Sequence, residues 1–153
     1  MVLPGLEQVR RFLLSTKSGE RWVIQKYISS PLLLGGRFWH ESPMRKFDIR
    51  MFALAQIVDG VHFRGYIYKE GYIRTSSFEY DIDDLSDRDV HLTNDAVQQD
   101  CHEYGKYEQG NKISSKDFAT YLQNYRKVDF YKVIYPKMRE AIKNTLDAIW
   151  LRL

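Results

Sequence analysis

The run of residues 47–57 constrains this chain more than any other, because it combines the composition of a buried strand with opposite charges near its start. Aromatic and aliphatic side chains predominate in it, as they do in β-strands. Side chains alternate between the faces of a strand, so Asp48 and Arg50 share one face while Ile49 and Met51 share the other. A carboxylate and a guanidinium are costly to desolvate unless polar groups meet them. The pattern favours a structural ion pair and leaves a charged ligand as the alternative.

Turn residues divide the middle of the chain into further strands. Asp59 and Gly60 form a hairpin signal, Gly71 marks a second tight turn, and Pro31 ends an earlier strand because proline cannot donate to a ladder. We expect residues 37–45 to form an exposed loop and residues 78–89 an acidic linker. The middle of the chain should be an antiparallel meander. The predicted strands span residues 21–28, 47–57, 61–69 and 72–76.

Helical signals lie toward both ends. Residues 7–15 carry apolar side chains on one side, and Ser114 or Ser115 caps a helix that reaches Tyr121. Pro136 suits a first helical position. We expect the helix of residues 136–153 to pack on one face of the sheet, so the predicted fold class is α+β, an antiparallel sheet flanked by helices. Its apolar stripe consists of Met138, Ile142, Leu146, Ile149 and Leu153.

Composition excludes several classes of protein. At 153 residues the chain is one domain or part of one, and it is long enough to bury a core. It has no apolar run that could span a bilayer and no secretory leader, so we expect no membrane partner. A net charge of +3 without a basic, aromatic-rich cluster argues against nucleic acid. Cys101 is the single cysteine, which excludes an internal disulfide or a paired-cysteine zinc site and fits a cytoplasmic protein.

The acidic run at residues 81–89 does not have the pattern of a calcium loop. Counted from Asp81, the sixth and twelfth places hold Ser86 and Leu92, where such a loop needs Gly and Glu. We therefore expect an exposed acidic loop and no metal site within this chain. Local motifs also supply no self-contained catalytic constellation.

A series of motifs is more specific. They read VIQKYI at 23–28, PLLL at 31–34, RKFDIR at 45–50, YKEGYIRTSS at 68–77 and HLTN at 91–94, with YGKYE at 104–108 and GNK at 110–112 extending the series. In this order and spacing they resemble the tubulin–tyrosine ligase-like family. Members have an ATP-grasp fold and join amino acids to tubulin. The resemblance runs from about residue 22 to residue 121.

The resemblance implies roles for particular residues. Arg50 and Arg74 match the catalytic cationic pair at the reacting end of the nucleotide, and Arg74 also suits the carboxylate of the amino-acid substrate. Guanidinium groups fit these tasks because they bind phosphoryl and carboxylate oxygens in pairs and stabilise developing charge. The residues that match ATP contacts are Gln25, Lys26, Tyr27 and Ile28 at the adenine, together with Lys46, Asp48, Thr93 and Asn94.

The resemblance also bounds what this chain contains. Residues 1–153 correspond to a single partial ATP-grasp domain, with the phosphate loop expected before residue 1. The cofactors are ATP and magnesium, and the magnesium ligands are expected beyond residue 153. Residues 95–99 depart from the common family pattern beside the amino-acid substrate, and residues 38–42 are an insertion.

The expected function is ATP-dependent ligation of glutamate, glycine or tyrosine to tubulin through an acyl-phosphate. The alternative is a truncated or degenerate ligase-like protein with a structural or binding role on ciliary or axonemal microtubules. Either reading places the protein on the cytoskeleton, with tubulin or microtubules as its partner. No nucleic acid or membrane is expected as a partner.

Overall fold

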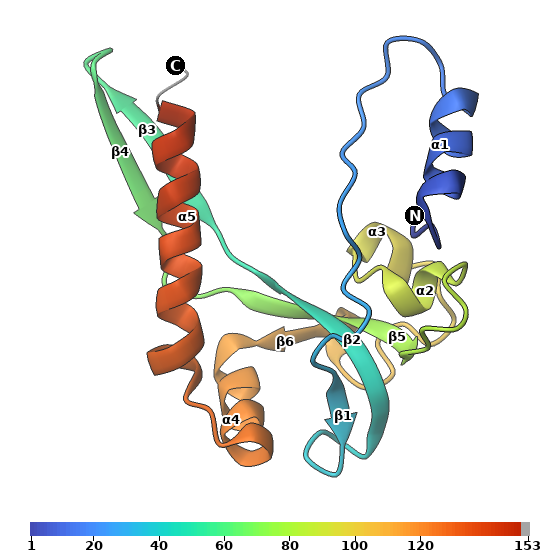
Figure 1. Ribbon diagram of the computed structural model, residues 1–153. Helices are drawn as coiled ribbons and strands as arrows, with labels where there is room; N and C mark the ends of the chain where they lie inside the picture. Colours follow the sequence, from blue (N-terminus) through green and yellow to red (C-terminus); the bar gives the residue numbers. More distant parts are fainter. Residues whose placement is uncertain (151–153) are drawn as a thin grey trace.

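A four-stranded antiparallel sheet of order β1-β2-β5-β6 forms the centre of the protein (Figure 1). The computed structural model describes residues 1–150. The β3–β4 hairpin is a separate two-stranded sheet. Strands are β1 (Leu34–Gly36), β2 (Ser42–Arg50), β3 (Ala53–Val58), β4 (His62–Ile67), β5 (Tyr72–Glu79) and β6 (Lys112–Ser114). Helices are α1 (Leu6–Ser15), α2 (Arg88–His91), α3 (Asp95–Gln98), η1 (Gln109–Asn111), α4 (Ser115–Arg126), η2 (Phe130–Ile134) and α5 (Tyr135–Trp150).

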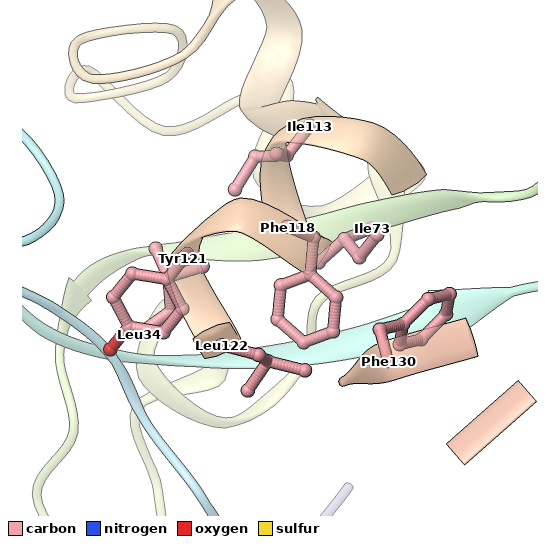
Figure 2. Close-up of a cluster of buried hydrophobic side chains, with 7 residues drawn as sticks. All are labelled: Leu34, Ile73, Ile113, Phe118, Tyr121, Leu122 and Phe130. Atoms are coloured by element: carbon pink, nitrogen blue, oxygen red, sulfur yellow. The ribbon is translucent and has the colours of Figure 1, made fainter. Parts of the chain in front are cut away.

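Helix α4 covers the apolar face of the four-stranded sheet. Ser114 caps this helix through a hydrogen bond from the Asp117 backbone N–H to its hydroxyl, 3.0 Å long, as the sequence predicts. The helix continues beyond Tyr121 to Arg126. Figure 2 shows the buried side chains that α4 gathers against the strands. This core consists of Leu34, Ile73, Ile113, Phe118, Tyr121, Leu122 and Phe130.

The β3–β4 hairpin turns at the predicted place. Asp59 and Gly60 both have positive φ, 52° and 69°, which is the backbone that a two-residue hairpin turn requires. Helix α5 lies beside this hairpin (Figure 1), and Leu146 packs directly against Gly65 of β4. The start of α5 reaches the core through Tyr135 and Met138. The predicted α+β class, an antiparallel sheet flanked by helices, is confirmed and agrees with part of an ATP-grasp fold.

The predicted strand at residues 21–28 is wrong. This segment has no strand conformation and passes beside α1 as extended chain, with Val23 and Ile24 exposed. The Trp22 ring packs edge-on against Phe12 of α1, with their centroids 4.8 Å apart. Strand composition is not sufficient for a strand, because a strand needs a neighbour for its backbone groups and residues 1–150 supply none here.

The predicted strand at residues 47–57 is split in the structure. The ladder stops after Arg50 and resumes at Ala53, so the residues after the break belong to the separate hairpin sheet. The expected loop at residues 37–45 is also too long, because β2 already begins at Ser42. Of the predicted meander, the β3–β4 hairpin is confirmed, but the next link is wrong because β5 pairs with β2 and β6 and not with β4.

The last helix differs from expectation in what it covers. We expected residues 136–153 to pack on one face of a single sheet that included residues 61–69. The structure has two sheets, and α5 lies along the β3–β4 hairpin while α4 covers the four-stranded sheet. The reason is the break after β2, which creates a second sheet with an apolar surface of its own. Leu153 of the predicted stripe lies outside the described residues. No helix within residues 1–150 is long and apolar enough to cross a membrane.

Candidate nucleotide-binding site

The sheet face opposite the core carries the charged residues of the family motifs. In the β2–β5 register Asp48 lies opposite Arg74, and Arg50 lies opposite Tyr72. Alternation along β2 places Lys46 on this same face, while Phe47 and Ile49 turn to the core. The shared face of Asp48 and Arg50 is as predicted. The structure therefore brings the Lys46, Asp48, Arg50 and Arg74 positions together on one surface.

Asp48 and Arg74 form a bidentate ion pair. Arg74 Nε donates to Asp48 Oδ1 at 2.9 Å, and Nη2 donates to Oδ2. The Arg74 side chain is 15% exposed and that of Asp48 is 40% exposed, so the pair lies at the surface of the site. The hydrogen bonds to Asp48 raise the pKa of the Arg74 guanidinium. Within residues 1–150 its Nη1 group has no hydrogen-bond partner.

Lys46 joins β2 to two distant segments. Its Nζ donates to the Tyr27 hydroxyl at 3.1 Å and to the His91 carbonyl oxygen at 3.0 Å. The same nitrogen lies 4.3 Å from the centre of the Tyr27 ring, a cation–π contact. Burial lowers the pKa of Lys46 from its usual value, since the charged form loses solvation. Three motifs that are far apart in the sequence therefore meet at one ammonium group.

The other predicted adenine residues lie on the extended segment around Tyr27. Gln25, Lys26 and Ile28 are exposed, whereas Tyr27 is half-buried against Lys46. A cavity of about 580 Å³ lies between this segment and α1, lined by residues that include Gln25, Lys26 and Tyr27. It is of the size and mixed apolar–polar lining that suit a small ligand. Ile28 does not line this cavity.

Thr93 and Asn94 occupy the loop between α2 and α3. Thr93 is buried and Asn94 is exposed at the residue before α3. This loop follows His91, whose carbonyl binds Lys46, so both residues lie near the β2 edge of the site. No side-chain hydrogen bond joins either of them to Lys46 or Arg74 in the part of the chain that the structure describes. Their role as ATP contacts stays a prediction.

A second charged cluster flanks Arg74. Lys112 of β6 lies opposite Arg74 in the β5–β6 register, and its Nζ donates to Asp95 Oδ2 at 2.8 Å. The Tyr104 hydroxyl donates to Asp95 Oδ1 at 2.8 Å. These bonds lower the pKa of Asp95, and the bond to Asp95 raises the pKa of Lys112. Sequence analysis did not assign this cluster to the site, although the departure at residues 95–99 pointed to the region.

Comparison with known proteins places these features in a family. A family model described as the tubulin-tyrosine ligase family matches residues 2–151. This chain belongs to the tubulin-tyrosine ligase family. Tubulin glycylase 3B of Tetrahymena thermophila is 37% identical over 133 residues, which cover 84% of this chain. Protein monoglycylase TTLL8 of Homo sapiens is 36% identical over 135 residues, or 82% of this chain. Probable tubulin polyglutamylase TTLL9 of Bos taurus is 28% identical over 130 residues, or 85% of this chain.

The match covers only part of these tubulin-tyrosine ligase family members. The aligned region is 10% of the Tetrahymena glycylase, 14% of the human monoglycylase and 26% of the bovine polyglutamylase.

The family's RKFDIR motif also contains a residue that sequence analysis left without a role. Arg45 is fully buried on the core face, and its guanidinium binds both carboxylate oxygens of Glu108. Trp39 Nε1 and the Thr75 hydroxyl donate to the same carboxylate. This network ties the loop before β6 to the sheet, so Arg45 is structural. Alternation places Arg45 with Phe47, but no local signal identifies a partner 63 residues later in the chain.

No group of three or more metal-ligating side chains lies within residues 1–150. The magnesium site that the family resemblance implies stays a prediction.

Proposed function

We propose that this chain is the nucleotide-binding part of an ATP-dependent ligase that joins an amino acid to tubulin through an acyl-phosphate. One observation carries the proposal: Lys46, Arg50 and Arg74 lie on one face of the sheet, and Lys46 binds Tyr27, which lines the cavity beside α1. Cationic donors of this kind form strong hydrogen bonds to phosphate groups. The names of two relatives, a tubulin glycylase and a probable tubulin polyglutamylase, support tubulin as the substrate.

The charged face suits both stages of this reaction. First, a substrate carboxylate oxygen attacks the γ-phosphorus of ATP, forming an acyl-phosphate and releasing ADP. The amine of the second substrate then attacks the acyl carbon, releasing phosphate and a proton. Arg50 and the free Nη1 of Arg74 would bind the oxygens on which negative charge is carried in both stages. Lys46 would bind the nucleotide, and Asp48 holds the Arg74 guanidinium in a fixed orientation.

The cluster around Lys112 offers a place for the amino-acid substrate. Lys112 and Arg74 are cross-strand neighbours, and Lys112 binds the Asp95 carboxylate. A carboxylate beside two cations matches the opposite charges of a free amino acid. Glycine, glutamate and tyrosine all carry those groups, so this arrangement does not choose among them. Tubulin within ciliary or axonemal microtubules is the proposed partner, which places the protein on the cytoskeleton.

Incorporation of a labelled amino acid tests the proposal. Full-length protein would be incubated with tubulin, magnesium, ATP and labelled glycine, glutamate or tyrosine in turn. We expect one of the three to be incorporated, with one ADP formed per amino acid and none without ATP. Arg50→Ala should abolish incorporation, whereas Arg88→Gln, which removes an exposed charge on α2, should not. Absence of transfer for all three would refute the ligase, and microtubule binding without transfer would support the non-catalytic alternative.

A further inference from the structure

The Lys46 ammonium is held by a chain of hydrogen bonds that passes through His91. The Tyr27 hydroxyl lies 2.7 Å from His91 Nδ1, and His91 Nε2 lies 2.8 Å from the backbone carbonyl oxygen of Asp84. The His91 side chain is buried, with only 2% of the residue exposed. The chain connects the extended segment, β2 and the acidic loop before α2, none of which are neighbours in sequence.

One tautomer of His91 satisfies every partner in this chain. A carbonyl oxygen can only accept, so the proton of the imidazole is on Nε2, which donates to Asp84. Nδ1 then carries a lone pair and accepts the proton of the Tyr27 hydroxyl. The hydroxyl oxygen in turn accepts from Lys46. In this arrangement His91 orients the Tyr27 lone pair toward the ammonium.

We propose that His91 is a positioning residue for nucleotide binding, which acts by fixing the Tyr27 hydroxyl and thereby the Lys46 ammonium. His91 contributes twice, because its backbone carbonyl is the second acceptor for Lys46. An ammonium has three N–H donors. With two of them bound to Tyr27 and to His91, the third is left to point at a ligand acceptor. This role rests on the proposed function, since it requires that Lys46 binds ATP.

A test of this role must separate it from the part that the His91 ring plays in packing. Its ring packs edge-on against Tyr27 and Tyr80, with centroid distances of 5.6 and 5.7 Å, so deleting the ring would also disturb packing. Substitutions must therefore separate the acceptor at Nδ1 from the bulk of the ring. His91→Asn retains an acceptor close to the Nδ1 position, whereas His91→Gln moves its amide toward Asp84 and leaves that position empty. Tyr27→Phe removes only the hydroxyl oxygen and keeps the ring under Lys46.

Kinetics of the full-length protein test this role, with ATP as the varied substrate. We expect His91→Gln and Tyr27→Phe each to raise KM for ATP about tenfold, the effect of one hydrogen bond to a charged group, with kcat within about twofold of wild type. His91→Asn should restore KM to within about threefold of wild type. In a Lys46→Met background, His91→Gln should have no further effect on KM.

The control and the opposing outcomes are specific. Arg88→Gln changes an exposed residue of the same short helix and should bind ATP as wild type does. An unchanged KM in both His91→Gln and Tyr27→Phe, or an undiminished effect of His91→Gln in the Lys46→Met background, would overturn the positioning role. If His91→Gln does not fold, Tyr27→Phe decides the question. Wild-type protein that does not bind ATP would instead refute the proposed function, and this role with it.

Discussion

Arg45 and Arg74 make a matched pair of substitutions that separates structure from function. Each guanidinium donates two hydrogen bonds to one carboxylate, but Arg45 faces the core and Arg74 faces the site. The side chains of Arg45 and Glu108 are 0% and 4% exposed, whereas those of Arg74 and Asp48 are 15% and 40% exposed. Replacing each arginine by methionine removes the guanidinium and keeps most of the aliphatic stem.

The expected magnitudes follow from these exposures. Removing one partner of a buried ion pair costs about 3–5 kcal/mol, because the other charge stays buried and unpaired, and this applies to Arg45→Met. Arg74→Met breaks a pair that water reaches, so its cost should be about 1 kcal/mol or less. At roughly 2–4 °C per kcal/mol for a domain of about 150 residues, Arg45→Met lowers the melting temperature by about 6–20 °C. Arg74→Met lowers it by less than about 4 °C.

Activity should show the opposite order. Arg74→Met should abolish transfer of labelled amino acid to tubulin, because phosphoryl and carboxylate oxygens lose their paired donor. Arg45→Met should still transfer at a temperature where it is folded. Urea unfolding and the transfer assay on both variants measure the two quantities. A loss of about 3 kcal/mol or more for Arg74→Met would show a structural pair, and wild-type transfer by that variant would remove Arg74 from the mechanism.

Further predictions concern single contacts. The lowered pKa of Asp95 means that its bond to Lys112 stabilises the fold above pH 3.8, the ordinary pKa of the group, and that this stability is lost as the pH falls through the lowered pKa. In Lys112→Met, an NMR titration should find the Asp95 pKa shifted back up. An unchanged pKa would contradict the pair. Phe118→Ala, at the centre of the core, should cost about 3–5 kcal/mol in urea unfolding, and a cost below about 1 kcal/mol would contradict the packing. Gly71→Ala would place a Cβ 2.3 Å from the Arg50 carbonyl oxygen and should cost about 1–3 kcal/mol, with wild-type stability as the contrary result.

The sequence determined the features that depend on neighbouring residues. The Asp59–Gly60 turn was predictable because few residues adopt positive φ at low cost, and the Ser114 cap because a hydroxyl there binds the first free N–H groups. The common face of Asp48 and Arg50 follows from the period of two along a strand. The order and spacing of the motifs indicate the family by themselves, and the family model agrees.

Only the tertiary structure decided which segments meet. Period-two alternation says which way a side chain faces but not what it faces. Asp48 is bound by Arg74 from another strand rather than by a neighbour on its own strand, and Lys46 meets Tyr27 and His91 from two distant motifs. The segment at residues 21–28 has the composition of a strand and yet forms none, because ladder hydrogen bonds require a partner that lies elsewhere in the chain or outside it. Pairings of this kind depend on the path of the whole chain, so no local pattern contains them.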